Sequence, residues 1–248
     1  GAEALAAALA GWIGAGVEAV ACDAERDADL AIAAAATARL RERVLWVGSA
    51  GLARHLPAAL GLARDQAPAG IPSAVAGPVL TVVGSLSGVA RAQGSALAAA
   101  HGVRTLVAEA AMLRAGAADP GWSRTVLTLG NMLSSGEDVL LTTAADSSAD
   151  LREGRALAAA LGRLVAEQGA PIGALVMTGG ETARAVATAL GLGAIRLLGE
   201  VEPGVPLGIS EGARVLPVVT KAGAFGHAET LIRCREALRR LVAQHERG

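Results

Sequence analysis

The stretch Gly173-Ala174-Leu175-Val176-Met177-Thr178-Gly179-Gly180-Glu181-Thr182-Ala183-Arg184 decides the fold. Its first half is an apolar run bounded by glycine, which predicts a buried strand. Gly179-Gly180 favours a tight turn, because glycine accepts positive φ angles and has no Cβ. The alanine-rich residues 181–190 predict a helix that ends at Gly191. Such a strand, turn and helix direct main-chain N–H groups at an anion, most often phosphate, although glycines at this place also serve packing alone.

The same alternation of apolar runs and helical segments repeats along the chain. Strands are expected at residues 17–23, 44–49, 79–84, 104–107, 138–143, 174–178, 194–199 and 214–220. Helices are expected at 27–41, 50–61, 88–101, 109–114, 123–134, 149–168, 182–190 and 227–245, whereas residues 203–208 are expected to be irregular. The alternation predicts a three-layer α/β fold, with a mostly parallel, Rossmann-like sheet covered by helices on both faces.

Residues 63–78 interrupt this alternation with three prolines and little periodicity, which is typical of a linker. We therefore expect three parts. A partial second α/β segment occupies residues 1–65, a linker follows at 66–78, and the larger domain spans 79–248.

Composition excludes several functional classes. With 22 basic and 23 acidic residues the net charge is −1, which argues against nucleic acid as a partner. No run approaches the roughly 18 strongly apolar residues of a membrane helix. Cys22 and Cys234 lie far apart without a CxxC motif, so neither a disulfide framework nor a zinc site is indicated. Residues 1–10 lack the basic start of a secretory signal, and we expect a soluble, cytoplasmic protein.

The basic residues are distributed unusually, because Lys221 is the only lysine among the 22 basic residues. The only phenylalanine, Phe225, lies four residues later. A compact ammonium meets a phosphate as a point charge, whereas the guanidinium group of arginine requires a planar fork. Lys221 is therefore a candidate phosphate ligand. The other interpretation is a surface lysine beside a core phenylalanine.

Three glycine- or serine-rich turns follow expected strands, at residues 84–87, 178–182 and 221–226. Ligands of parallel sheets collect beyond the carboxyl ends of the strands, so these turns are expected to share one edge. Ser85 and Ser87 are expected to cap the next helix or to offer hydroxyls to a ligand, two roles that are compatible.

In the second turn, Thr178 and Thr182 flank the glycines in a similar way. Glu181 either complements the helix N-terminus or approaches a ribose hydroxyl or a metal ion. In the third turn, Ala222, Gly223 and Gly226 would close over a nucleotide while Lys221 neutralises phosphate charge.

Phosphoryl transfer depends mainly on positioning and charge stabilisation, so main-chain donors, one lysine and Mg²⁺ are chemically sufficient. The Walker pattern, the dinucleotide fingerprint GxGxxG and the GxSxG elbow are absent from the sequence. No general base and no metal ligands can be assigned from the residues alone.

Four segments resemble, in order, the carboxy-terminal nucleotide-binding domain of the four-carbon acid sugar kinases. They are residues 84–87 with Gln93, 178–183, 199–206 and 220–226. Residues 46–53 are similar to the end of that family's amino-terminal substrate domain. The resemblance implies ATP-dependent phosphorylation of threonate, erythronate or an oxo-tetronate at the terminal hydroxyl. It also implies that Ser85, Gly179–Thr182 and Gly223 contact ATP.

The chain departs from the family pattern at Glu181, where aspartate is frequent, and at Ala224, where glycine is common. The family's early paired-aspartate motif has no counterpart here. We therefore expect this chain to supply the nucleotide-binding half, with ATP and an acid sugar as partners; its activity by itself is left open. A homo-oligomer is compatible with these features. The alternatives are a non-catalytic module that binds a nucleotide or a phosphorylated metabolite, and a structural α/β domain.

Overall fold

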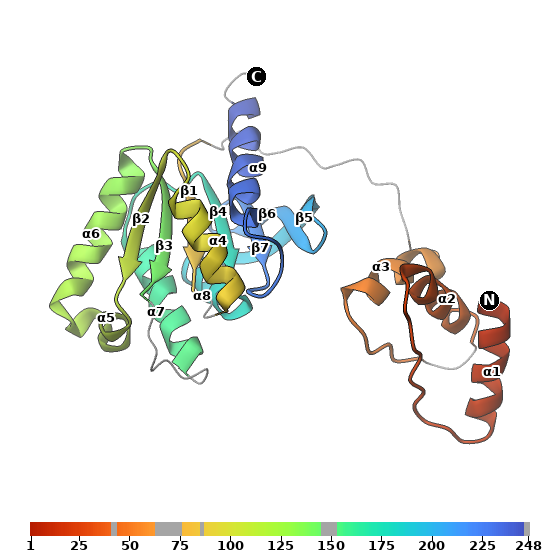
Figure 1. Ribbon diagram of the computed structural model, residues 1–248. Helices are drawn as coiled ribbons and strands as arrows, with labels where there is room; N and C mark the ends of the chain where they lie inside the picture. Colours follow the sequence, from red (N-terminus) through yellow and green to blue (C-terminus); the bar gives the residue numbers. More distant parts are fainter. Residues whose placement is uncertain (41–43, 63–75, 85–86, 145–152, 246–248) are drawn as a thin grey trace. The chain divides into compact units, whose positions relative to one another are not determined.

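The computed structural model describes residues 1–40, 44–62, 76–84, 87–144 and 153–245 (Figure 1). The chain divides into two compact units, Gly1–Ala67 and Pro68–Gly248. Most of the expected linker lies outside the described residues. Its bounds, and the assignment of the two units to substrate and nucleotide domains, stay predictions.

The larger unit is built on a seven-stranded sheet in the order β2-β3-β1-β4-β7-β6-β5. The strands are β1 (Val79–Val83), β2 (Val103–Ala108), β3 (Asp138–Thr143), β4 (Ala174–Thr178), β5 (Leu192–Glu202), β6 (Val205–Gly212) and β7 (Pro217–Lys221). Every neighbouring pair along the part β2-β3-β1-β4-β7 is parallel, whereas β6 is antiparallel to both β7 and β5. The mostly parallel sheet predicted from the sequence is confirmed.

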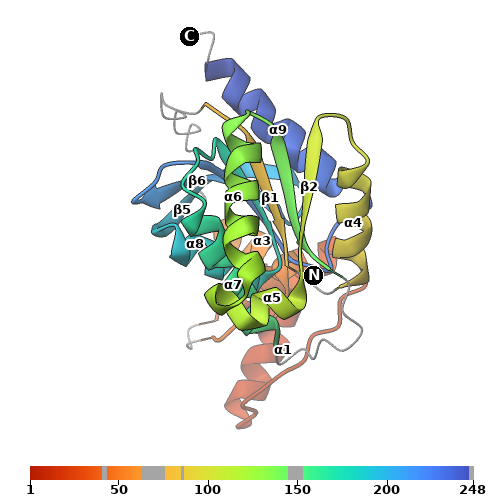
Figure 2. The ribbon, with the colours of Figure 1, turned by 90° about the vertical axis from the view of Figure 1, so that its left-hand side faces the viewer.

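Helices cover both faces of this sheet (Figures 1 and 2). They are α4 (Gly88–Ala98), α5 (Ala110–Ala115), α6 (Pro120–Ser134), α7 (Gly154–Glu167), α8 (Gly180–Ala189) and α9 (Thr230–His245), with a 3-10 turn at Gly116–Ala118. Helices α4 and α9 pack on one face, and α5 to α8 pack on the other. The described part of this unit is therefore the three-layer α/β arrangement expected.

The central strands are apolar throughout because both of their faces are buried. Leu80 and Leu175 point into the core under α5 to α8, whereas Val79 and Val176 point into the core under α4 and α9. All residues of β1 and β4 are buried. Full burial of each such side chain contributes about 1.5–3 kcal/mol. This burial fixes the strands whose ends carry the candidate site.

The prediction of an irregular segment at 203–208 is wrong from Val205 onward. Residues 205–212 form β6, which follows β5 through a tight turn at Pro203-Gly204, where Gly204 has φ 80°. Pro206 and Gly208 have low strand propensity and hid this strand in the sequence. In the sheet, Pro206 lies beyond the residues of β6 that pair with β7. A Cβ on Gly208 would come within 2.6 Å of the Arg196 carbonyl oxygen, so close strand contact explains the glycine.

The N-terminal unit contains α1 (Ala2–Gly14), α2 (Asp27–Thr37) and α3 (Ala50–Ala59). The strands predicted at 17–23 and 44–49 are wrong, because both segments lack regular structure and the described residues of this unit contain no strand. Leu45 is 88% exposed and Val47 is 87% exposed. An apolar segment forms a strand only beside a partner, and these described residues supply none. No described helix in either unit is long and apolar enough to cross a membrane.

Candidate functional site

The three turns meet at one edge of the sheet because their strands are adjacent, parallel and in register. Val83 at the end of β1 pairs with Thr178 at the end of β4, and Thr178 pairs with Lys221 at the end of β7. The Gly179 amide donates a hydrogen bond to the Lys221 carbonyl oxygen at 2.9 Å. The Ser87 hydroxyl donates to the Gly223 carbonyl oxygen at 2.8 Å. The convergence expected from the sequence is therefore present, whereas contact of these residues with a nucleotide stays a prediction.

The first turn joins β1 to α4. Ser87 is the N-cap of α4, where its hydroxyl oxygen accepts a hydrogen bond from the Ala90 amide at 3.1 Å. Its expected capping role is thus observed, while Ser85 lies outside the described residues. Gly84 lies against the start of α8, since a Cβ there would collide with Thr182 and come within 2.9 Å of Leu161. This glycine lets the end of β1 approach the beginning of α8 closely.

The second turn joins β4 to α8 and presents the beginning of that helix to solvent. Gly179 is the N-cap with φ 95° and ψ 127°, a conformation reserved for glycine, and no side chain caps this helix. Gly180 is exposed, and a Cβ there would meet no atom within 4 Å. The first N–H groups of a helix have no partner within it and attract anions. An open helix start of this kind suits a phosphate group.

Glu181 lies in the first turn of α8 and forms ion pairs with Arg155 at 3.1 Å and Arg184 at 3.7 Å. Both arginine side chains are more than three-quarters exposed, so these pairs contribute little to stability. An acidic residue at this place complements the helix dipole. Of the two roles considered for Glu181, this structural one is observed, and contact with ribose or metal stays a prediction.

Two threonines flank the glycines and are buried. Thr178 is fully buried, and its hydroxyl oxygen has no hydrogen-bond partner among the described residues. Thr182 is also buried and contacts Gly84, as described above. A buried hydroxyl without a partner costs roughly 1–3 kcal/mol, and such atoms in native proteins call for an explanation. The position of Thr178 at the strand edge fits a hydroxyl that donates to a bound anion.

The third turn holds the sole lysine in a buried position and the sole phenylalanine in an exposed one. Lys221 is 3% exposed, and Phe225 is 52% exposed. The interpretation of a surface lysine beside a core phenylalanine is therefore wrong. The ammonium of Lys221 donates to the carbonyl oxygens of Ala222 at 2.7 Å, Gly223 at 3.4 Å and Phe225 at 2.9 Å. Burial lowers the pKa of Lys221, while the charges of Cys234 and Glu202 act in the opposite direction.

Residues outside the predicted set complete this turn. Gln93, fully buried on α4, donates from Nε2 to the carbonyl oxygens of Phe225 at 2.9 Å and His227 at 2.8 Å. Thr230 donates to Glu202 at 2.5 Å and accepts from the His227 amide at 2.8 Å. Gly226 has φ 83° and lies against Thr230 and Glu202. Gln93 and Glu202 were within the motifs quoted above, but only the fold shows which carbonyls and hydroxyls they reach.

No group of three or more His, Cys, Asp or Glu side chains that could hold a metal ion occurs in the described part of the chain.

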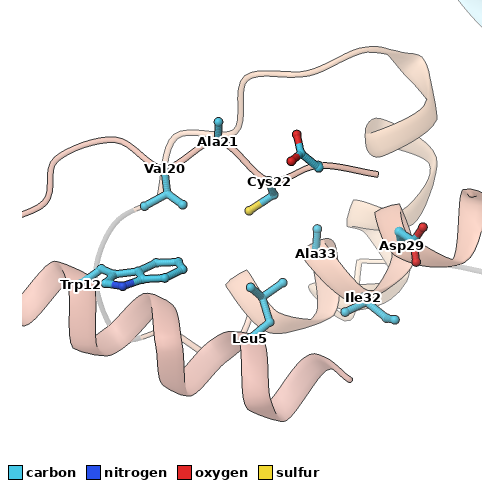
Figure 3. A pocket seen from close by; sticks show the side chains of 9 residues that line it. Leu5, Trp12, Val20, Ala21, Cys22, Asp29, Ile32 and Ala33 are labelled. Atoms are coloured by element: carbon cyan, nitrogen blue, oxygen red, sulfur yellow. The ribbon is translucent and has the colours of Figure 1, made fainter. Parts of the chain in front are cut away.

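A separate pocket of about 270 Å³ lies in the N-terminal unit. Figure 3 shows Leu5 and Trp12 of α1 facing Val20 and Cys22 of the following extended segment, with Ile32 of α2 beside them. Its lining is mostly apolar, with the carboxylates of Asp23 and Asp29 as its acidic groups. An acidic sugar needs positively charged or hydrogen-bond-donating groups, so this pocket does not fit such a ligand.

Comparison with known proteins assigns family descriptions to both units. Residues 80–231 match the family model described as "Nucleotide-binding C-terminal domain". Residues 1–56 match the family model described as "Sugar-binding N-terminal domain".

Among curated relatives, the D-threonate kinase of Cupriavidus necator is 43% identical over 233 residues, which are 93% of this chain and 56% of the relative. The D-threonate kinase of Bordetella bronchiseptica is 38% identical over 237 residues, with 94% and 56% covered. The chain thus spans a little over half the length of these relatives.

Among solved structures, a Bordetella bronchiseptica protein described as a domain-swapped dimer with bound citrate has a TM-score of 0.57 and 38% identity, covering 94% of this chain and 56% of that one. A Haemophilus influenzae protein has a TM-score of 0.63 at 18% identity, covering 96% and 58%, and supports the fold alone. From the family models and these relatives, the chain belongs to the four-carbon acid sugar kinase family.

Proposed function

We propose that this chain binds ATP at the three turns and supplies the nucleotide-binding half of a kinase. The acceptor is a four-carbon acid sugar of the threonate, erythronate or oxo-tetronate type, phosphorylated at its terminal hydroxyl. The observation that carries the proposal is the meeting of three turns beside the start of α8, which is exposed and is not capped by a side chain. Relatives named D-threonate kinase and 3-oxo-tetronate kinase support the substrate class.

The phosphate groups of ATP suit the donors at this edge. In the second turn, the main-chain amides at the start of α8 would meet phosphate oxygens, with Gly180 leaving room for close approach. The hydroxyl of Thr178, buried without a partner, would gain an acceptor there. The amides of Gly223, Ala224 and Gly226 would meet the phosphates from the other side. Ser85 and Ser87 belong to the same proposal through the first turn.

Mg²⁺ fits this site as an ion that arrives with the nucleotide. It keeps several waters and binds through one or two carboxylates together with substrate phosphates, so an acidic cluster is unnecessary. When bound, it would neutralise charge on the phosphates. Glu181 is the carboxylate that we place nearest to this role, although it is ion-paired with Arg155.

The contribution of this half to catalysis is positioning and charge stabilisation. Oriented amides cost no reorganisation as charge develops on the transferred phosphoryl group. The acceptor hydroxyl and its general base belong to the substrate side, of which residues 1–56 match one part. We propose a cytoplasmic, homo-oligomeric enzyme, in keeping with the domain-swapped dimer described for the Bordetella bronchiseptica protein.

Calorimetric titration of the chain with ATP, ADP, AMP and inorganic phosphate in the presence of Mg²⁺ tests nucleotide binding. The proposal expects heat with ATP and ADP, and absence of heat with every ligand would overturn it. Phosphorylation is then assayed with a panel of four-carbon acids, for the chain alone and mixed with the amino-terminal part of the Cupriavidus necator relative. Nucleotide binding without phosphorylation in the mixture would instead support a non-catalytic module.

A further inference from the structure

We propose that Lys221 is a positioning residue, which orients the loop of residues 222–227 so that its amides face the phosphates, and does not contact the phosphates itself. This inference rests on the proposed function. It revises the role expected for the lysine as a direct phosphate ligand.

Four of the six carbonyl groups of this loop accept hydrogen bonds from buried or partly buried side chains. Those of Ala222, Gly223 and Phe225 accept hydrogen bonds from the Lys221 ammonium. Gln93 donates to the carbonyls of Phe225 and His227, and the Ser87 hydroxyl donates to that of Gly223. Four carbonyl groups of one short loop thus face three buried or partly buried donors.

This arrangement determines where the amides of the loop point. In a trans peptide the N–H group of each residue points away from the preceding carbonyl group, and the described residues contain no cis peptide bond. The N–H groups of Gly223, Ala224 and Gly226 therefore lie on the side opposite to Lys221 and Gln93. The Phe225 amide between them donates to the Ala222 carbonyl oxygen at 3.1 Å, so Gly223, Ala224 and Gly226 are the amides left to form a concavity of the kind that binds anions.

All donors of the Lys221 ammonium are used within this loop. It has three N–H donors, and three carbonyl oxygens lie within 3.4 Å of its nitrogen. Lys221 is also 3% exposed, which places its charge behind the loop and not on the rim. An arginine could not replace it, because a planar fork does not direct donors at three carbonyls of one tight turn. That requirement accounts for a single lysine in a chain whose other 21 of 22 basic residues are arginine.

Lys221→Met and Lys221→Arg test the inference, with Arg104→Met as the control that removes an exposed charge at the amino end of β2, away from the three turns. Amide hydrogen exchange of residues 222–227 is measured without ligand, and ATP affinity is measured by calorimetry. Both Lys221 variants are expected to exchange faster in this loop and to lose affinity about tenfold or more, because charge-assisted hydrogen bonds are lost. The control is expected to change neither quantity.

The inference would be overturned if Lys221→Arg kept wild-type ATP affinity and amide exchange while Lys221→Met bound ATP more weakly. A positive charge alone, without the directed hydrogen bonds, would then account for the role of the lysine. If the wild type fails to bind ATP, the proposed function fails, while ligand-free exchange still decides whether Lys221 orders the loop. If the Lys221 variants do not fold, a measurement on the wild type still tests the inference. The ¹⁵N resonance of the sole lysine side chain is expected to keep its position when ATP is added, whereas a large shift would indicate direct phosphate contact.

Discussion

The adjacent residues Gly179 and Gly180 allow the conformational and binding roles of the second turn to be separated. Gly179 has φ 95°, where an alanine is strained. Gly180 begins α8 in ordinary helical conformation, and a Cβ there would meet no protein atom within 4 Å. The substitutions Gly179→Ala and Gly180→Ala therefore add the same methyl group to two very different environments.

The two substitutions are expected to change the stability of the folded chain in opposite directions. Strain at Gly179 costs of order 1–3 kcal/mol, which lowers the Tm of a domain of this size by about 2–12 °C. Alanine in place of Gly180 stabilises the helix by about 0.4–1 kcal/mol, because the unfolded chain loses freedom. In the proposed site, however, the new methyl group lies where a phosphate approaches the helix amides. Losing one charge-assisted hydrogen bond of about 1.5–3 kcal/mol weakens ATP binding about 10- to 150-fold.

Thermal unfolding and ATP calorimetry on the same two variants give the assay. We expect Gly180→Ala to be at least as stable as the wild type and to bind ATP at least tenfold more weakly. A Gly180→Ala variant with unchanged ATP affinity would refute the placement of phosphate at the start of α8. A Gly179→Ala variant with unchanged Tm would refute the backbone conformation of the turn.

Further predictions concern three buried polar groups. Burial raises the pKa of the Cys234 thiol to about 12, so only Cys22 should react with a thiol reagent at pH 8 in the folded chain, and two reactive thiols before unfolding would contradict this. Because the pKa of this thiol in the folded chain exceeds the ordinary value of 9.0, the thiol contributes stability that is present below pH 9 and lost as pH rises toward 12. Cys234→Ala should remove this loss in urea unfolding. Burial lowers the pKa of Lys221, so a ¹³C titration of this single lysine should have its midpoint below 10.5, with the unfolding free energy rising between that midpoint and 10.5; a midpoint at or above 10.5 would show that its burial is wrong. Asp138 is buried and accepts hydrogen bonds from the Val79 amide at 2.7 Å, Arg235 at 2.6 Å and Arg239 at 2.9 Å, so Asp138→Ala should destabilise the chain by about 3 kcal/mol in urea unfolding, and a loss below 1 kcal/mol would contradict that network.

The sequence predicted the parallel part of the sheet because those strands are buried on both faces. The apolar runs of β1 and β4 end in glycine turns, so the hydrophobic pattern and the turn residues indicate the same strand ends. Since parallel strands share one carboxyl edge, the meeting of the three turns also followed from the sequence.

Other features depended on long-range contacts that one sequence does not display. β6 contains Pro206 and Gly208 and forms a strand only because β5 and β7 lie on either side of it. The segments at 17–23 and 44–49 have strand-like composition but no strand partner among the described residues. The burial of Lys221 could not be predicted either, because the neighbouring loop that surrounds its ammonium is held by Gln93 of α4, which is 132 residues from Phe225 in the sequence.

The central claim is that one nucleotide touches all three turns. The most direct measurement is a ¹⁵N–¹H spectrum of the chain titrated with ATP and Mg²⁺. We predict that the amide signals of Ser87, Gly179–Thr182 and Gly223–Gly226 shift together with one binding constant. Saturable binding of ATP that leaves the signals of Gly179–Thr182 and Gly223–Gly226 unmoved would contradict the account.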